Sequence, residues 1–197
     1  MIFEKTKTGS AETVAECLKG GGIAILPTDT VYGFSGIVDL SSTEKIYTAD
    51  SRIRAIKGRS ETKPLIQLIA KPDDIRLFTD DAIPESVFSA WPGALTVIVS
   101  IKEHSPLKNS PATVAFRCPG DAWLREVIAK CGAPIYSTSV NRSGQPVLDA
   151  FSSIEKEFGK EVDLIVNDGD KKGALPSTII AIESGCIKVL RQGSVRL

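Results

Sequence analysis

Short apolar runs rich in valine, isoleucine and leucine recur along this chain, and each is stopped by a proline, a glycine or a polar turn. Runs of this length and composition are typical of buried strands, because β-branched side chains pack well on a pleated surface. A chain with so many of these runs must pair them in a sheet. The predicted strands cover residues 23–26, 64–69, 95–101, 113–118, 135–139, 162–166, 178–182 and 187–190.

Amphipathic segments with helix-start signals lie between the runs. Ser10 is predicted to cap a helix that ends at the glycines of residues 20–22. Ser41 and Ser152 are each followed three residues later by glutamate, which is the spacing of a capping box, and they predict two more helix starts. Further helices are predicted from residue 72, over 83–91 and over 121–130.

The order of these elements indicates the fold class. Strands and helices alternate irregularly, and some strands follow one another through short turns. This pattern favours an α/β fold with a mixed sheet and flanking helices over a strict βαβ array. No repeat or compositional break marks a linker, so residues 1–197 are predicted to form a single domain.

Charge and composition exclude several classes of protein. The chain has 24 Lys and Arg and 24 Asp and Glu, so a nucleic-acid binder that relies on bulk positive charge is excluded. One histidine argues against a zinc site or a Ser-His-Asp triad. No apolar run approaches the ~20 residues of a membrane helix, and no signal peptide is visible. Four cysteines without a CxxC pair predict reduced core thiols in a cytoplasmic protein.

The widespread motifs of nucleotide binding and nucleophilic catalysis are missing. The sequence contains no GxGxxG after a strand, no GxxxxGK[ST], no GxSxG and no HExxH. A catalytic site in this chain must therefore work with cations, hydroxyls and backbone amides.

Two polar segments at strand ends could supply hydroxyls. The segment 27–33 (PTDTVYG) follows a predicted strand directly, where ligands bind in open α/β sheets, although a turn held by its own hydroxyls is the alternative. The segment 137–144 (STSVNRSG) ends another strand, and Ser137 and Ser139 share one face by the period of two. Asn141 can join them as the chain turns, and a plain polar turn is again the alternative.

Positive charge is concentrated in one cluster and at two strand ends. The cluster suits phosphate binding, with a solvated helix face as the alternative, and it consists of Arg52, Arg54, Lys57, Arg59 and Lys63. Arg117 and Arg191 each close an apolar strand and need a partner, because an unpaired buried charge is costly. That partner is either a ligand anion or a structural counter-ion.

Seven segments form an ordered set along the chain. They are PTDTVYG at 27–33, KGR at 57–59 with KPL at 63–65, WPGALTVIV at 91–99, TVAFRCP at 113–119, STSVNRSGQP at 137–146, PSTII at 176–180 and VLRQG at 189–193. Together they resemble the YrdC/Sua5 family over nearly the whole chain. The resemblance implies a twisted mixed sheet with flanking helices and a concave, positively charged surface.

The resemblance also implies an activity. Members of this family are L-threonylcarbamoyladenylate synthases, which join L-threonine, bicarbonate and ATP, release pyrophosphate and serve threonylcarbamoyladenosine modification of tRNA. Catalytic positions match Lys57, Arg59, Ser139 and Asn141. ATP-binding positions match Lys57, Arg59, Lys63, Thr113, Ser139, Asn141 and Arg191. Threonine-binding positions match Thr30, Arg117, Ser137 and Ser177.

The resemblance further implies Mg2+ carried in with ATP and no metal held by protein ligands. Its expected partners are tRNA and other tRNA-modification proteins, in the cytoplasm and without a membrane. One position departs from the pattern, because Leu68 stands where many members carry a histidine that helps hold threonine.

Two other functions stay open at this point. Because leucine cannot form the histidine's hydrogen bond, Leu68 leaves room for a related adenylate-forming enzyme that uses another amine. The basic cluster leaves room for a YciO-like RNA-binding module without this activity. Against the second stand the neutral net charge and an aromatic content of 6%, which supply few platforms for base stacking.

Overall fold

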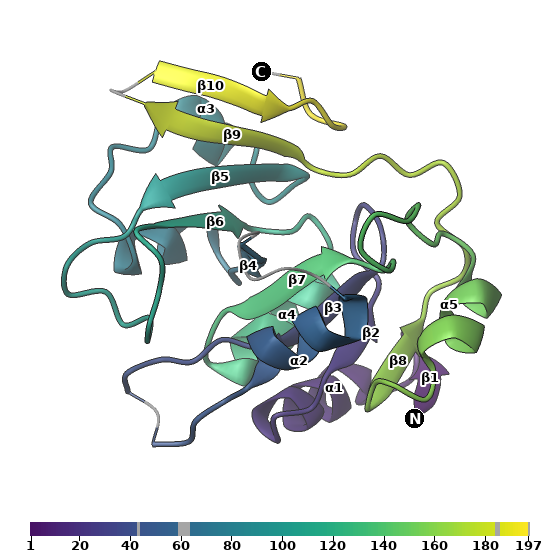
Figure 1. Ribbon diagram of the computed structural model, residues 1–197. Coiled ribbons are helices and arrows are strands. Elements are labelled where there is room, and N and C mark those ends of the chain that lie inside the picture. The colour runs from purple at the N-terminus through teal and green to yellow at the C-terminus, as the bar shows by residue number, and fades with distance from the viewer. Residues whose placement is uncertain (43, 59–63, 184–185, 197) are drawn as a thin grey trace.

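The computed structural model describes residues 1–42, 44–58, 64–183 and 186–196, and their strands form one mixed sheet (Figure 1). The ten strands lie in the order β1-β8-β2-β3-β7-β4-β6-β5-β9-β10. Parallel pairs such as β4–β6 lie beside antiparallel pairs such as β5–β6, so the expected mixed sheet is confirmed. The strands are β1 (Ile2–Glu4), β2 (Ala24–Leu26), β3 (Gly33–Ile37), β4 (Ile66–Leu68), β5 (Leu95–Ser100), β6 (Thr113–Arg117), β7 (Ile135–Ser139), β8 (Leu164–Asn167), β9 (Thr178–Glu183) and β10 (Cys186–Arg191).

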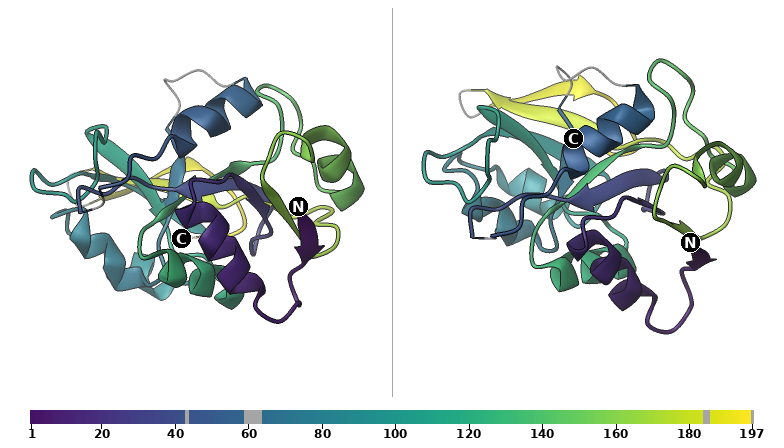
Figure 2. Two further views of the ribbon diagram at one scale, coloured as in Figure 1. Left: turned by 90° about the horizontal axis from the view of Figure 1, so that it is seen from below. Right: turned by 60° about the horizontal axis from the view of Figure 1, so that its bottom comes forward.

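Helices flank the sheet on both faces, as expected. In Figure 2, α2 lies on one side of the sheet together with α5, while α1 and α4 lie on the other side. The helices are α1 (Ser10–Lys19), α2 (Ala49–Lys57), the 3-10 helix η1 (Pro72–Leu77), α3 (Glu85–Ser89), α4 (Ala122–Cys131) and α5 (Phe151–Phe158). The predicted short helices at 72 and 83–91 and the longer helix at 121–130 are therefore confirmed, each within a few residues.

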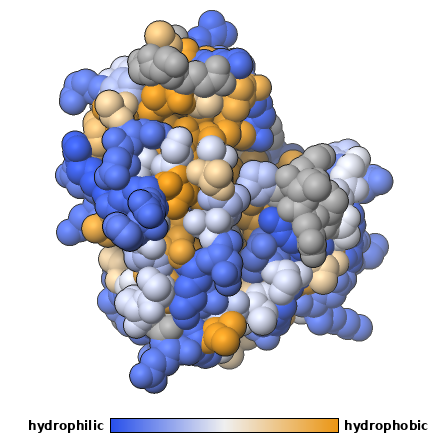
Figure 3. Space-filling model, turned by 60° about the vertical axis from the view of Figure 1, so that its left-hand side comes forward, coloured by the Kyte–Doolittle hydropathy of each residue, from blue (hydrophilic) through white to orange (hydrophobic). Residues whose placement is uncertain are grey.

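Two apolar clusters hold these layers together. One joins β2 and β3 to α2 and α5, and in it the Phe34 and Phe158 rings meet edge to face at 4.9 Å. The larger cluster joins the sheet to α1, α4 and η1, and in it the Phe78 and Phe116 rings stack at 5.0 Å. Outside these cores, one face of the molecule carries a recessed band of apolar surface between polar side chains (Figure 3).

Strand β3 is absent from the sequence-based prediction, because two glycines and a serine give it little strand propensity. Packing explains those glycines. A Cβ atom on Gly36 would lie 2.6 Å from the Ala49 Cβ of α2, and one on Gly33 would lie 2.7 Å from Ser137 Oγ of β7. The strand pairs with both β2 and β7, so close approach rather than propensity selects its residues.

Three predicted helix caps are wrong. The first helix has Gly9 at its N-cap, and Ser10 Oγ instead donates to the Lys5 carbonyl at 2.7 Å. Ser41 begins no helix, because its hydroxyl donates to the Pro106 carbonyl and α2 starts only at Ala49. Ser152 does not cap α5, because the helix has already begun at Phe151, and Asp170 Oδ1 instead accepts from the Phe151 N–H at 2.9 Å.

Two smaller differences concern the first strand and the cysteines. Strand β1 was not predicted, because it is three residues long and pairs only with β8, far along the chain. All four cysteines are free, but they are not all core thiols. Cys118 and Cys131 are buried, whereas Cys186 is exposed on the edge strand β10.

Candidate functional site

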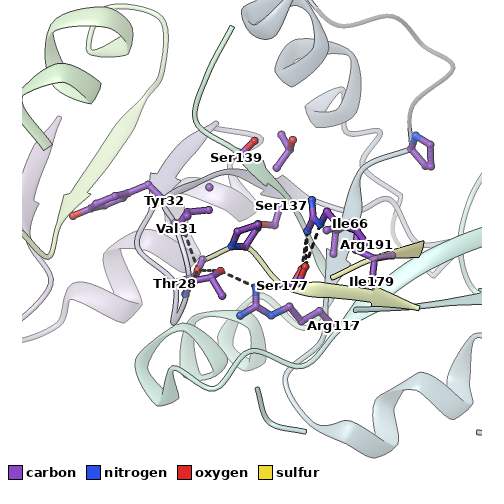
Figure 4. A pocket seen from close by; sticks show the side chains of 15 residues that line it. Thr28, Val31, Tyr32, Ile66, Arg117, Ser137, Ser139, Ser177, Ile179 and Arg191 are labelled. Atoms are coloured by element: carbon purple, nitrogen blue, oxygen red, sulfur yellow. Dashed lines mark hydrogen bonds between the residues drawn. The ribbon is translucent and has the colours of Figure 1, made fainter. Parts of the chain in front are cut away.

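Three connections meet over the ends of the central strands and enclose a cavity of about 180 Å3 (Figure 4). The first is the turn between β2 and β3, which carries the PTDTVYG segment. The second is the segment that leaves the end of β7 at Ser139, and the third is the long connection from β8 into β9. The cavity is lined by Thr28, Thr30, Val31, Tyr32, Gly33, Pro64, Ile66, Arg117, Ser137, Thr138, Ser139, Pro176, Ser177, Ile179 and Arg191.

The β2–β3 turn is held by hydroxyl groups. Thr28 Oγ1 donates to the Val31 carbonyl at 2.8 Å, accepts from the Thr30 N–H at 3.0 Å and lies 2.9 Å from Thr30 Oγ1. The Tyr32 hydroxyl donates to the Gly169 carbonyl at 2.8 Å and accepts from the Asp168 N–H at the same distance. The segment is therefore both a hydroxyl-stabilised turn and one wall of the cavity, so the two alternatives raised by its sequence are compatible.

Arg117 closes the floor of the cavity and is 5% exposed. Its Nε donates to the Gly93 carbonyl at 3.0 Å, Nη1 donates to Thr30 Oγ1 at 3.0 Å and Nη2 donates to Asp29 Oδ1 at 2.6 Å. Burial lowers the pKa of Arg117 despite the opposing charge of Asp29. Within the described chain these bonds use three of the guanidinium's five N–H groups, so the ion pair with Asp29 still leaves donors for a ligand.

Arg191 approaches the same cavity from β10. Its Nη2 donates to the Ser177 carbonyl at 2.7 Å and to Ser177 Oγ at 3.3 Å, and its Nε donates to the same carbonyl at 3.2 Å. Burial and the charge of Arg117 both lower the pKa of Arg191. Two guanidinium groups that repel each other across one small cavity favour an anionic ligand between them.

Lys57 and the end of β7 form a second, adjoining cluster. The Lys57 ammonium group donates to the carbonyls of Ser139 and Asn141 and to Asn141 Oδ1, the last at 2.8 Å. Ser139 Oγ donates to the same Asn141 Oδ1 at 2.9 Å. Lys57 is 3% exposed and lies over the Phe34 ring, 5.3 Å from its centroid. The KGR and STSVN segments, distant in sequence, thus meet through one lysine.

The residues expected to hold threonine all line the cavity. They are Thr30, Arg117, Ser137 and Ser177. Of the residues expected at ATP, Ser139 and Arg191 also line it, and Lys57 with Asn141 adjoins it through Ser139. Thr113 does not line the cavity, because it lies at the opposite end of β6 from Arg117. Arg59 and Lys63 lie outside the described residues.

Several lining or supporting residues were not predicted from the sequence. Ile66 and Ile179 supply apolar walls, and nothing in a strand's apolar pattern marks which side chains border a cavity. Asp29 lies within a segment that the sequence singled out, yet its role as the partner of Arg117 depends on contact between residues 88 positions apart. Leu68 is 1% exposed in the apolar core and does not line the cavity.

Among residues 1–42, 44–58, 64–183 and 186–196, no group of three or more His, Cys, Asp or Glu side chains is arranged to hold a metal ion. No helix in those same ranges has the length and apolar character needed to cross a membrane.

Comparisons with known proteins agree with this arrangement. The family model Sua5/YciO/YrdC, described as "Telomere recombination", matches residues 16–193. A protein of Mycobacterium leprae named putative threonylcarbamoyl-AMP synthase is 30% identical over 95% of this chain and 84% of its own length. The structure of Pyrococcus abyssi Sua5 complexed with L-threonine superposes with a TM-score of 0.83 at 26% identity, over 98% of this chain.

The extent of these matches differs. This chain spans 57% of the Pyrococcus abyssi structure, which is longer. Escherichia coli YciO shares the fold with a TM-score of 0.80 at 20% identity, over 98% of this chain and 95% of its own. With a family model that covers most of its length, and with the threonine-site residues of the resemblance gathered in one cavity, the chain belongs to the Sua5/YciO/YrdC family.

Proposed function

We propose that this protein is an L-threonylcarbamoyladenylate synthase, which makes threonylcarbamoyl-AMP from L-threonine, bicarbonate and ATP for threonylcarbamoyladenosine in tRNA. The observation that carries the proposal is the pair Arg117 and Arg191, which face one small cavity whose walls carry the hydroxyls of Thr30, Ser137 and Ser177. Pockets for drug-sized ligands measure roughly 300–1,000 Å3. A cavity of about 180 Å3 therefore suits an amino acid rather than a nucleotide.

The chemistry needs no nucleophile from the protein. The threonine amine adds to CO2 derived from bicarbonate and loses a proton, which gives a carbamate. A carbamate oxygen then attacks the α-phosphorus of ATP, and the bond to the bridging oxygen breaks as pyrophosphate leaves. The protein contributes position and positive charge, which are the main sources of rate acceleration in phosphoryl-type transfers.

Each cluster has a place in this scheme. Arg117 supplies N–H donors for the threonine carboxylate, as bidentate arginine–carboxylate pairs do. Lys57 holds the end of β7, where Ser139 lines the cavity and Asn141 adjoins it, at the place where the nucleotide would meet the carbamate. Arg191 lines the same cavity and suits a phosphate group. Arg59, Lys63 and Thr113 remain assigned to ATP by resemblance, and Mg2+ would arrive with the phosphates.

The remaining parts of the proposal concern the cell. The four cysteines are free, which suits the reducing cytoplasm. We place the reaction there, with tRNA and other tRNA-modification proteins as the recipients of the product and with residues 1–197 acting as one catalytic domain.

The test is pyrophosphate release by the purified protein, measured with ATP and Mg2+ while threonine and bicarbonate are each omitted in turn. Release should require both. Arg117→Met should lower kcat/KM for threonine by on the order of 10²-fold, because a charged hydrogen-bonded clamp is lost. Arg76→Met, which changes an exposed arginine on η1, should leave the rate within about twofold.

Two results would contradict the proposal. One is pyrophosphate release that persists without threonine. The other is release that responds equally to serine, alanine and threonine, which would instead point to an adenylate-forming enzyme with another amine substrate.

A further inference from the structure

Two buried threonines contact hydroxyls that face the cavity, and one of them, Thr28, lines the cavity itself. Thr28 Oγ1 lies 2.9 Å from Thr30 Oγ1, and Thr96 Oγ1, on β5, lies 2.8 Å from Ser177 Oγ. Thr28 is 4% exposed and Thr96 is completely buried. A hydroxyl has one proton to donate and two lone pairs that accept, so a count of partners decides which way each proton points.

The count around Thr28 leaves one arrangement. Its single proton goes to the Val31 carbonyl, which can only accept. Thr28 Oγ1 also accepts from the Thr30 N–H, so the contact between the two hydroxyls must use the Thr30 proton. Thr30 Oγ1 additionally accepts from Arg117 Nη1. The Thr30 hydroxyl is therefore left with one lone pair and no proton for a ligand.

The hydrogen-bond partners around Thr96 leave Ser177 with a proton to donate, which is the opposite of the result for Thr30. Among the described residues, Ser177 Oγ is the one hydrogen-bond partner of the Thr96 hydroxyl. Because a buried donor without an acceptor is costly, the Thr96 proton points to Ser177 Oγ. Ser177 Oγ also accepts from Arg191 Nη2. Both of its lone pairs are thus engaged, and its own proton is free to point into the cavity.

We propose that Thr28 and Thr96 are positioning residues that set the hydrogen-bond polarity of the cavity, so that Thr30 can only accept from a ligand and Ser177 donates to it. The proposal rests on the proposed function in assigning an amino acid to the cavity. A bound amino acid then presents an N–H or O–H group to Thr30 and an oxygen to Ser177. The opposite orientation would set two acceptors against each other at Thr30 and two donors at Ser177.

The polarity itself can be measured without any substrate. In a mixture of H2O and D2O, a hydroxyl that exchanges slowly splits the 13Cβ resonance of its residue into two lines, whereas a fast one gives one averaged line. We expect two lines for Thr28 and Thr96, whose protons are enclosed, and one line for Ser177. Two lines for Ser177 together with one line for Thr96 would overturn the assignment.

The positioning role is tested by replacing the hydroxyl of Thr96 with a methyl group. In Thr96→Val, the Ser177 hydroxyl loses its fixed partner, so KM for threonine should rise about tenfold while kcat at saturating threonine stays within about twofold. Thr96→Ser should restore KM, since it keeps the hydroxyl. Thr79→Val is the matched control, because Thr79 is also buried, at 5% exposed, but lies outside the cavity, and it should leave KM unchanged.

The outcomes separate this proposal from the proposed function. A protein that consumes no threonine contradicts the proposed function, while the NMR measurement still decides the polarity. Normal activity with an unchanged KM in Thr96→Val contradicts the positioning role alone. An altered KM in Thr96→Val that Thr96→Ser does not restore would also contradict it, because shape rather than the hydroxyl would then be responsible.

Discussion

At the scale of single residues, the site depends on groups that are neutralised or satisfied before any ligand binds. Arg117 is paired with Asp29, and Lys57 has its donors directed to the end of β7. Buried charges need such partners, since an unpaired one would unfold the site or lose its proton. What remains available for a ligand is a small number of directed hydrogen-bond groups, which is a condition for selecting one amino acid over others.

The pairing of Arg117 leads to a residue-scale prediction about Asp29. In Asp29→Asn the guanidinium loses its counter-ion, so the free energy of unfolding should fall by about 1–3 kcal/mol, and KM for threonine should rise because the arginine is less constrained. Urea unfolding and pyrophosphate release measure the two effects.

The control for Asp29→Asn is Asp73→Asn, which breaks the exposed ion pair with Arg76. Surface pairs contribute little, so this variant should change the free energy of unfolding by less than about 0.5 kcal/mol. Equal effects of the two substitutions would show that the pair with Asp29 has no special role in the site.

At the scale of elements, close approach determines how α2 sits on the sheet. Gly36 of β3 faces Ala49, the first residue of α2, with room for no further atom between them. The other end of α2 carries Lys57. The packing of α2 on β3 therefore sets where Lys57 meets Ser139 and Asn141, so Gly36 affects the geometry of the site without touching it.

This packing predicts that a methyl group added at Gly36 lowers the free energy of unfolding and that removing the methyl group of Ala49 compensates for it. Gly36→Ala should lower the free energy of unfolding by about 1–3 kcal/mol, because its Cβ would lie 2.6 Å from the Ala49 Cβ. Ala49→Gly removes that Cβ and should cost up to about 1 kcal/mol alone, through helix propensity. Combined, the two changes should cost less than their sum, and denaturant unfolding of all four proteins measures the coupling. Strict additivity would contradict the proposed contact.

At the scale of the whole molecule, one charge cluster ties the N-terminal segment to two segments far along the chain. Lys5 contacts Asp121 at 2.5 Å and Asp168 at 3.2 Å, and Lys171 contacts the same Asp168 at 2.7 Å. The backbone beside Asp168 binds the Tyr32 hydroxyl of the β2–β3 turn. The cluster therefore anchors the connection that leads from β8 into the cavity wall.

The cluster predicts a pH-dependent contribution to stability. Burial alone would raise the pKa of Asp168, but the hydrogen bonds and charges of Lys171 and Lys5 outweigh it and hold this pKa below its ordinary value. A lowered pKa means that the folded state favours the carboxylate, so the stabilisation is present above the unfolded-state pKa of about 3.9 and is lost as the pH falls through the lower, folded-state pKa.

Asp168→Asn should accordingly reduce the free energy of unfolding by about 0.5–1.5 kcal/mol at pH 7, and the difference from the parent protein should shrink below about pH 4. Asp80→Asn, at an exposed position, serves as the control and should change the free energy of unfolding by less than about 0.5 kcal/mol at pH 7. Urea unfolding between pH 3 and 7 makes the comparison, and a gap that stays constant across that range would contradict the role of Asp168.

Local sequence alone accounts for much of this protein. β-branched runs mark most of the strands, and glycines, prolines and apolar periodicity place most helices within a few residues, since these signals act over a few positions, although the predicted serine caps were wrong. Through the family resemblance, the ordered segments also name Thr30, Arg117, Ser137 and Ser177 as residues expected to hold threonine, and the fold gathers these four around one cavity. The failures arise where distant contacts override local signals: β3 carries glycines because it packs closely on α2 and β7, and the N-terminus of α5 is satisfied by Asp170.

Tertiary structure alone decides which groups face one another. Asp29 meets Arg117 across 88 positions, Lys57 meets Asn141 across 84, and Thr96 meets Ser177 across 81. No periodicity encodes such pairs, because they follow from the strand order of the sheet and the connections that cross it. Those contacts occupy some hydrogen-bond donors and acceptors of the cavity and leave others available to a ligand. The hydrogen-bond polarity of the cavity is therefore set by the tertiary structure and is not encoded in any one segment.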